Sequence, residues 1–350
     1  MNRQNNFNAL RLMAAIMVMV GHMAYLTGGL PATILGAGVQ AIGVQFFFLI
    51  GGYLITKSYL SDPHPIRYLC KRVLRIFPPL VVFVLLVVLV AGPLLSSLPA
   101  DVYFRQRATW DYLRNLLLFP IYVLPGVFQA NIYPAAVNGS LWTLPVEFFM
   151  YLILPPLLNI TGIRQNRKYA KPLWIALTIF VFAANLYRIA CYPNFRLVIY
   201  GTDWMQAMSI IPFYFIGSMF ATCIPKEKLN LQIAALLLLG SMMFRTNYLT
   251  EVVLLSIAIS YFVFSFAFAP MPVFAKLMQK QEITYGLYLY GFFFQQLLVD
   301  IIANRMHISI GCNLYILLSV PLTAVFAYLS AVFVETPASN FCKKLIQKIR

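Results

Sequence analysis

The sequence predicts an all-α polytopic membrane protein with about ten transmembrane helices and both termini in the cytoplasm. Of its 350 residues, 61% are hydrophobic and only 10% are charged, whereas soluble domains are about half apolar and about a quarter charged. Apolar windows long enough to cross a bilayer recur along the chain. Lys and Arg concentrate in alternate connections between those windows.

A membrane-spanning helix needs about 20 mainly apolar residues. The first window runs to Leu26 without a small-residue cleavage site, so we expect a retained span and not a signal peptide. The seventh window is short, so nine or eleven spans are also compatible with the sequence. Tyr112–Val123 is shorter and aromatic, and we expect it to lie in the interface or to re-enter the membrane. The ten windows lie at roughly residues 8–27, 37–56, 77–97, 141–160, 172–190, 205–223, 229–244, 250–270, 283–303 and 313–334.

Basic residues favour one side of the predicted bundle. If the N-terminus is inside, the cytoplasmic connections and the C-terminal tail are richer in Lys and Arg than the opposite connections. This bias predicts cytoplasmic termini and an even number of spans. It also accounts for most of the formal net charge of +16, so we expect no nucleic-acid partner. The cytoplasmic basic residues include Lys57, Arg67, Lys71, Arg72, Arg75, Arg164, Arg167, Lys168, Lys171, Lys226, Lys228, Lys343, Lys344 and Lys348.

Domain organisation is expected to be simple. The longest polar connection, Ser96 to Gly139, lies on the predicted outer side, and the chain has no internal repeat. The five cysteines are scattered without metal-ligand spacing, so we expect neither a disulfide framework nor a metal site. The sequence does not predict an oligomeric state.

Two ionisable residues share the first span, Arg11 and His22. Eleven positions at about 100° each return to within about 20° of the same helix face, and they separate the residues by roughly 16 Å. Such residues cost free energy in lipid unless they face a cavity or a partner. Arg11 can be a basic anchor at the inner surface. His22 can be a structural partner of a neighbouring helix, or a general base for a hydroxyl nucleophile, because its proton moves near neutral pH.

The fourth span opens with a polar block that contains Glu147. We expect Glu147 to lie toward the outer half of the membrane, at a depth similar to that of His22. A carboxylate there needs a partner, which His22 or an outer-loop arginine could supply. If it meets His22, it would orient the imidazole, as the third member of a catalytic triad does. The residues near it that could bind an acceptor or a developing oxyanion are Asn138, Ser140, Trp142 and Thr143.

A basic cluster, Lys71, Arg72 and Arg75, precedes the predicted third span. Arg72 and Arg75 are three residues apart, a spacing that suits a bidentate grip on phosphate oxygens. The cluster can equally be a topology signal. Glu335, at the inner end of the last span, is a plausible ion-pair partner for one of these arginines.

Several motifs occur together in a specific order. They are the Arg11–His22 pair, the block Gly43–Ile55, the basic motif Arg72–Pro78, the block Ser140–Glu147, the block Tyr285–Tyr290 and the segment Val334–Pro337. In this order and spacing, nearly end to end, the chain resembles the acyltransferase-3 family of membrane acyltransferases. That family modifies cell-surface polysaccharides, lipopolysaccharide O-antigen, peptidoglycan and some small metabolites.

The resemblance implies that residues 1–350 form a single acyltransferase-3-like membrane domain with no separate soluble domain, in a bacterial inner membrane. It implies an O-acetyltransferase that moves an acyl group from cytoplasmic acyl-CoA, acetyl-CoA by default, to a hydroxyl of a glycan such as an O-antigen, exopolysaccharide or lipid-linked oligosaccharide. It implies that His22 is the catalytic residue and that Arg11, Arg72 and Arg75 help to bind the acyl-CoA. As a further hypothesis from the residues themselves, Glu147 would steady His22 and Lys71 would contact the phosphates. No metal is implied.

The chain departs from the family pattern at three positions. Asn8 and Gln45 replace carboxylates that the family often has, and Gly291 replaces a frequent histidine in the ninth span. His22 is therefore the only imidazole expected inside the membrane.

Two other classes of protein compete with an enzyme. A transporter that flips a glycan or an acyl donor would be expected to show repeats and matching interrupted helices, which the sequence lacks. A purely structural membrane subunit gives no reason for a histidine and a carboxylate inside the spans.

Overall fold

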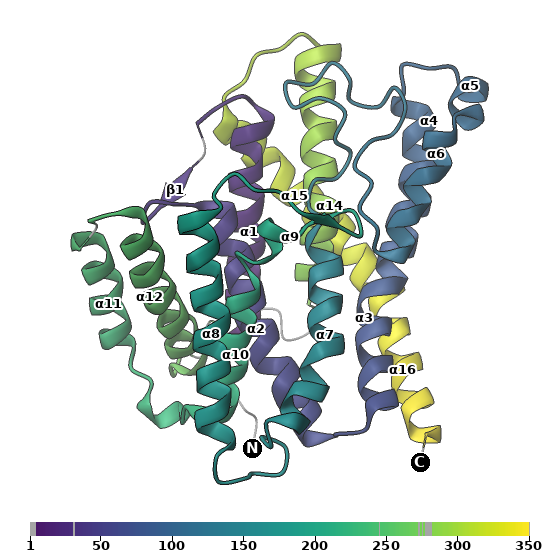
Figure 1. Cartoon of the computed structure of the whole chain (residues 1–350). Coiled ribbons are helices and arrows are strands. Elements are labelled where there is room, and N and C mark those ends of the chain that lie inside the picture. Colours follow the sequence, from purple (N-terminus) through teal and green to yellow (C-terminus); the bar gives the residue numbers. More distant parts are fainter. Residues whose placement is uncertain are drawn as a thin grey trace.

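The computed structural model describes residues 5–30, 32–244, 246–271, 274, 276 and 282–349. These residues are mostly helical, as predicted, and the chain begins and ends at the same end of the bundle (Figure 1). Apart from an isolated bridge, the described residues contain two short hairpins, β1–β2 (Thr33–Ile34 with Ala37–Gly38) and β3–β4 (Val198–Ile199 with Thr202–Asp203). The longer helices are α1 (Phe7–Leu26), α2 (Val39–Ser61), α3 (Pro65–Leu86), α7 (Thr143–Ile160), α8 (Ala170–Cys191), α10 (Ile211–Cys223), α11 (Leu231–Met243), α12 (Tyr248–Phe268), α14 (Thr284–Val299), α15 (Cys312–Ser330) and α16 (Thr336–Lys348).

In the described part of the chain, nine helical segments are long and apolar enough to cross a membrane. Each overlaps one predicted window. Segments joined through one helical turn count together, so that α9 (Trp204–Ala207) and α10 form one span. The seventh window forms α11, which has 13 residues and is therefore only about 20 Å long. It packs against α12 but is too short to span a ~30 Å hydrocarbon core by itself.

The third span was predicted to start near residue 77, and this boundary is wrong. The helix begins at Pro65 and extends to Leu95 as a 31-residue segment, through a π-helical turn at Val87–Ala91. His64 caps its first turn by accepting a hydrogen bond from the backbone N–H of Arg67 at 3.3 Å. A hydropathy window misses this early start because it rejects basic residues, although basic residues are good helix formers. The basic cluster thus lies on the helix and not before it.

The connection between α3 and α7 contains short helices and a long irregular stretch. The helices are α4 (Gly92–Leu95), α5 (Ala100–Arg105), α6 (Arg107–Asp111) and the 3₁₀ helix Tyr112–Leu117. After them the chain enters the bundle, where Leu124, Val127 and Val137 are almost fully buried. Asn131 anchors this stretch by donating to the side chain of Gln296 on α14 at 2.8 Å. Irregular backbone is tolerated at membrane depth only where protein surrounds it.

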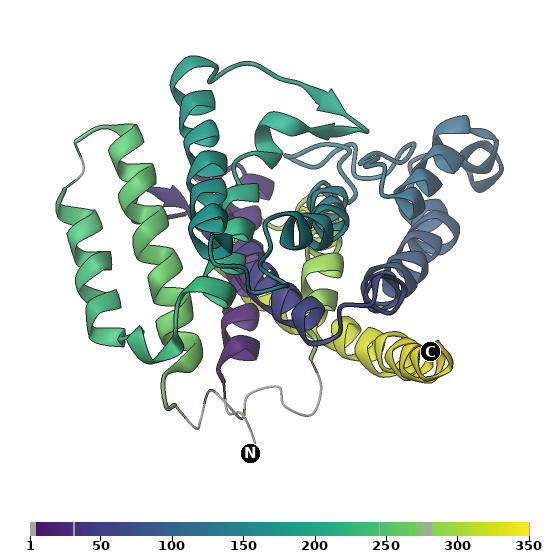
Figure 2. The same ribbon diagram turned by 60° about the horizontal axis from the view of Figure 1, so that its bottom comes forward.

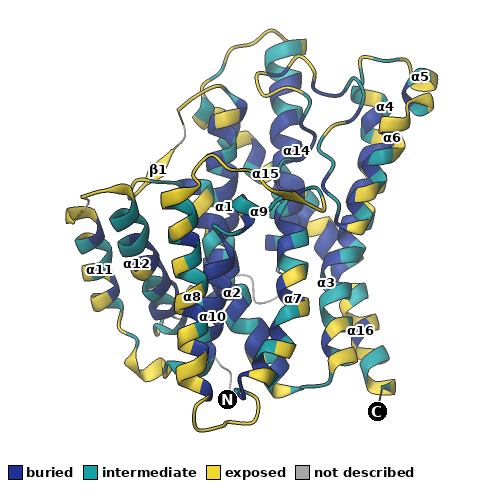
Figure 3. Ribbon diagram, in the orientation of Figure 1, coloured by how far each residue is buried: buried dark blue, intermediate teal, exposed yellow. Residues whose placement is uncertain are grey.

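Exposure follows the expectation for a protein in lipid. Figure 3 shows buried residues concentrated on the central helices α1, α2 and α14, with exposed residues on the outer faces of α8 and α11. The exposed residues of α8 include Ile179 and Phe180, which are 62% and 70% exposed. Large apolar side chains exposed in this way are typical of a protein surface that faces lipid and not of a monomer in water.

Glycines bring α2 and α10 into close contact. A Cβ added at Gly52 would lie 2.0 Å from the backbone oxygen of Tyr214, and one added at Gly217 would lie 2.1 Å from that of Leu49. Small residues at such crossings allow backbones to approach in membrane bundles.

We therefore expect Gly52→Ala to lower the stability of the protein by about 1–3 kcal/mol, because the helices must separate. The measurement is the thermal unfolding temperature of detergent-purified protein. Gly240→Ala is the matched control, because a Cβ there meets nothing within 4 Å. Equal unfolding temperatures for the two variants would contradict the close packing.

Candidate functional site

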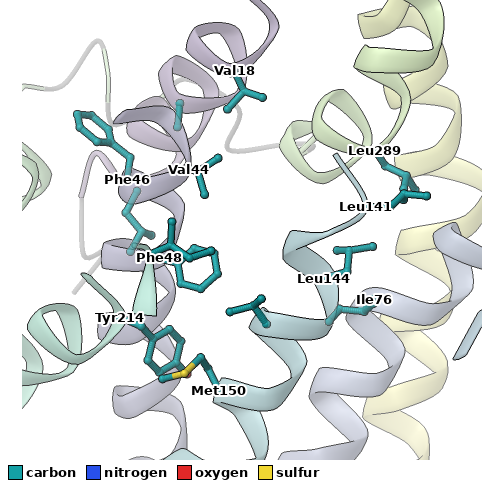
Figure 4. Packing of buried hydrophobic residues seen from close by; sticks show 14 of the residues in the cluster. Val18, Val44, Phe46, Phe48, Ile76, Leu141, Leu144, Met150, Tyr214 and Leu289 are labelled. Carbon is teal, nitrogen blue, oxygen red and sulfur yellow. The ribbon is translucent and has the colours of Figure 1, made fainter. Parts of the chain in front are cut away.

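A cavity of about 120 Å³ lies inside the bundle, between α1, α2, α3, α7, α10 and α14. Figure 4 shows part of its apolar lining: Val44, Phe48 and Tyr214 lie opposite Ile76 and Leu144. Its charged lining residues are Arg11, Arg72, Arg75, Glu147 and Glu282. The structure thus brings together three of the four basic residues that were candidates for donor binding.

Glu282, in the connection before α14, joins two of the arginines. Its Oε1 accepts hydrogen bonds from Arg11 Nη1 at 2.8 Å and from Arg75 Nη2 at 3.2 Å. Arg75 Nη1 also donates to Glu335 Oε2 at 2.9 Å, which confirms the predicted pairing of Glu335 with an arginine. Burial by itself would raise the pKa of Glu282, but the charges of Arg11 and Arg75, with hydrogen bonds from Thr284 and Arg11, lower it to about 2. Glu282 is therefore ionised at physiological pH and holds Arg11 close to Arg75.

Replacement of Glu282 by Gln should lower stability, because it leaves two neighbouring guanidinium groups without their shared anion. The pKa of Glu282 is depressed in the fold from an ordinary 4.5 to about 2. Its stabilising contribution is therefore complete above pH 4.5 and is lost as pH falls toward 2. Thermal unfolding of both proteins across this range should show a constant gap at the higher pH values that closes on acidification. A gap that widens on acidification would contradict the assignment.

Arg72 differs from the other two arginines of the cavity. Among the described residues it has no carboxylate within ion-pair distance, and its buried Nε has no hydrogen-bond partner. Its guanidinium lies over the rings of Tyr68 and Tyr151, at 5.9 and 5.7 Å from their centroids. Aromatic faces hold a cation in place without neutralising it. Arg72 therefore presents a positive charge with unused donors to the cavity.

Lys71 was a candidate for donor binding, and the structure places it elsewhere. Its Nζ donates to Asp62 Oδ2 at 2.8 Å, beside Arg67, which also pairs with Asp62. Hydrogen bonds from Arg67 and Lys71 lower the pKa of Asp62 to about 2. Adjacent residues point about 100° apart on a helix. Lys71 therefore does not line the cavity, although Arg72 does.

Glu147 lies in the arginine cavity, and the contact with His22, one of the two partners considered for it, is not found. It accepts a hydrogen bond from the hydroxyl of Tyr151, one turn further along α7. The prediction of a depth similar to that of His22 failed because it assumed that the fourth span starts at the membrane surface. In the structure the chain before α7 is already inside the bundle, with Asn138 fully buried and Ser140 nearly so. Glu147 consequently shares a cavity with Arg11, at the other end of α1 from His22.

His22 lies near the far end of α1, partly buried. Its ring packs edge-on against Phe292 of α14, with centroids 5.2 Å apart. Within the described residues the imidazole has no hydrogen-bond partner, and it is not among the residues that line the arginine cavity. A donor held by the arginines would therefore have to extend beyond the cavity to reach it.

The four candidate acceptor residues mainly fix the start of α7. Asn138 donates to the backbone oxygen of Leu289 at 2.7 Å and accepts from the backbone N–H of Ser140. The hydroxyl of Thr143 is 2.6 Å from that of Tyr288. Trp142 packs partly buried against the core. Thr143 alone of the four lines the cavity, and the buried hydroxyl of Ser140 has no partner among the described residues.

Sequence reasoning missed two residues of the site. Tyr151 follows Glu147 by four positions on one helix, which is a recognisable side-chain pair. Glu282 directly precedes an apolar span, and a carboxylate at that boundary was a signal for an arginine partner. In the part of the chain that the structure describes, no group of three or more His, Cys, Asp or Glu residues could hold a metal ion.

Comparison with known proteins gives a family match over most of the chain. A family model described as an acyltransferase domain matches residues 4–335. An O-acetyl transferase of Shigella phage Sf6 is 32% identical over 224 residues, which is 63% of each chain. Nodulation protein 10 of Rhizobium leguminosarum bv. viciae is 33% identical over 230 residues, 59% of each chain.

A peptidoglycan O-acetyltransferase of Listeria monocytogenes is 27% identical over 216 residues, which is 57% of this chain and 31% of that protein. The chain thus spans about 60% of the length of the first two relatives. No solved structure is significantly similar.

Proposed function

The chain belongs to the acyltransferase-3 family of membrane acyltransferases, and from this premise we propose that it is an O-acetyltransferase. It moves an acetyl group from cytoplasmic acetyl-CoA to a hydroxyl of a cell-surface polysaccharide or lipid-linked oligosaccharide. The names of two relatives, both O-acetyltransferases, support the reaction. The family assignment does not favour a transporter.

The observation that carries the proposal is the cluster of three guanidinium groups in one cavity. Arg11 and Arg75 share Glu282, and Arg72 keeps unused donors. Guanidinium groups bind phosphate oxygens through paired, charge-assisted hydrogen bonds. Coenzyme A carries several phosphates, so this cluster is suited to its binding from the side of the bundle where both termini lie.

The cavity volume supports a small acyl group. About 120 Å³ is well below the ~300–1,000 Å³ typical of pockets for drug-sized ligands. Its apolar wall can accept the short acyl end, and the arginines on its charged wall can bind the phosphates. Acetyl is therefore preferred over longer acyl groups.

In the proposed chemical step, His22 acts as the general base. The imidazole accepts the proton of the acceptor hydroxyl, and the hydroxyl oxygen attacks the thioester carbonyl. The carbon–sulfur bond then breaks, and the coenzyme A thiolate takes the proton from the imidazolium as it leaves. The products are the acetyl ester and free coenzyme A. Transfer through a transient acyl-enzyme gives the same two products.

Glu147 has a different role in this scheme from the one predicted. Through its hydrogen bond with Tyr151 it fixes the ring over which Arg72 lies. It is a positioning residue of the donor cavity. Thr143, hydrogen-bonded to Tyr288 at the cavity wall, remains a candidate to contact the acceptor.

The decisive test uses purified protein in detergent with acetyl-CoA carrying a labelled acetyl group. Release of coenzyme A together with labelled, alkali-labile ester on the glycan supports the proposal. In parallel, mass spectrometry of surface glycans from bacterial cells with and without the gene identifies the sugar that gains the acetyl mass. Movement of a glycan across vesicles with no ester formed would instead establish a transporter.

A further inference from the structure

A second hollow, of about 580 Å³, lies at the last turn of α8, which is the end of that helix farther from the two termini (Figure 1). It lies between the last turn of α8, the connection that follows it, and α9 with its following turn. We call it the α8–α9 groove. It shares no lining residue with the arginine cavity. On the predicted topology it faces the outer side, where a glycan acceptor would arrive.

Two arginines give the α8–α9 groove its charge. Arg188 and Arg196 both line it, and among the described residues neither has a carboxylate within ion-pair distance. Arg188 Nε donates to Asn185 Oδ1 at 3.2 Å, which orients the guanidinium and leaves its terminal nitrogens available. Asp203 also lines the groove, but its Oδ1 caps α9 by accepting from the backbone N–H of Met205 at 3.0 Å. The groove therefore retains a net positive charge.

Aromatic rings continue from the groove along the end of α8. The centroids of Tyr187 and Tyr192 are 5.8 Å apart, and those of Tyr192 and Phe195 are 6.3 Å apart. All three side chains are about half exposed or more. Exposed rings beside a few polar groups form a surface suited to the apolar faces of sugar rings, since binding sites combine aromatic walls with a few oriented polar groups.

Side chains near the α8–α9 groove contact α7, which lines the donor cavity, and the connection before α7. Trp204, in α9, packs edge-on against Phe149 of α7 with centroids 5.4 Å apart, two residues from Glu147. The β3–β4 hairpin reaches across to the connection before α7, where the hydroxyl of Tyr200 donates to the backbone oxygen of Leu117 at 2.8 Å (Figure 2). The elements that form the groove thus pack against α7, which lines the donor cavity.

We propose that the α8–α9 groove binds an anionic oxygen group of the glycan acceptor through Arg188 and Arg196. This inference rests on the proposed function. Two sources share the required chemistry, a phosphate that links the glycan to a lipid and an acid group on one of its sugars. The residues earlier considered for the acceptor are mostly buried, so they leave the long part of a glycan without a binding surface.

Direct binding tests the proposal apart from catalysis. Purified protein is titrated with a short polyprenyl diphosphate, with an oligogalacturonate and with the neutral sugar maltohexaose. The double variant Arg188→Gln/Arg196→Gln should bind the anionic probe at least tenfold more weakly than the unchanged protein. The matched control is Arg107→Gln in α6, which is 94% exposed and outside the groove, and it should bind as the unchanged protein does.

Each outcome of the titrations supports or overturns the proposal. Weaker binding of polyprenyl diphosphate in the double variant supports the lipid-linked phosphate, and weaker binding of oligogalacturonate supports an acidic sugar. The proposal is overturned if the double variant binds the anionic probes as tightly as the unchanged protein does. It is also overturned if the unchanged protein binds maltohexaose as tightly as the anionic probes. If the groove binds but purified protein never acetylates a glycan, the proposed function fails and the groove stands. If donor kinetics are normal and acceptor affinity does not change in the variant, the groove fails and the function stands.

Discussion

Replacement of His22 by Ala should reduce acetyl transfer by at least ~100-fold, because general bases contribute roughly 10²–10⁴ to the rate of proton-coupled steps. The loss should appear in kcat, with little change in the KM for acetyl-CoA, since His22 lies outside the arginine cavity. Initial rates of coenzyme A release with purified protein measure both constants.

His307→Asn provides the matched control. His307 is exposed and has a backbone φ of 56°, a conformation that Asn tolerates well. This variant should retain full activity. Full acetylation by His22→Ala at normal protein levels would exclude the imidazole as the base, even if the family assignment holds.

Replacement of Arg72 by Met should raise the KM for acetyl-CoA by ~10- to 100-fold, because hydrogen bonds to charged groups contribute about 1.5–3 kcal/mol. Arg72 is the guanidinium of the cavity that forms no ion pair among the described residues, so its loss breaks no ion pair. The fold should therefore survive. Arg72→Lys should recover part of the affinity, since it keeps the charge but not the planar fork.

Lys71→Met separates this effect from a general loss of positive charge. Lys71 is adjacent in sequence but pairs with Asp62 outside the cavity. Its replacement should leave the KM for the donor unchanged, because Arg67 still pairs with Asp62. If Lys71→Met and Arg72→Met raised KM equally, the donor would be held by diffuse surface charge and not by the cavity.

Prediction of the site from sequence succeeded where residues lie on one helix and failed where helix depth mattered. The three-residue spacing of Arg72 and Arg75 placed both in one cavity, and Glu335 does pair with Arg75. The prediction that Glu147 lies at a depth similar to that of His22 was wrong, because the irregular chain before α7 lowers the start of that helix into the bundle. The conformation of that chain depends on contacts such as that of Asn138 with Leu289, 151 residues away.

The sequence by itself determined where the apolar helices lie, apart from the early start of the third and the short seventh, and it determined the family. These depend on hydropathy, on charge and on ordered local motifs, which a linear chain displays directly. Only the tertiary structure decided that Glu282 joins Arg11 to Arg75, that Lys71 turns away and that Glu147 belongs to the donor cavity. Arg11 and Glu282 are 271 residues apart, and such pairings depend on how helices rotate and shift against one another, which side-chain packing fixes and local sequence does not.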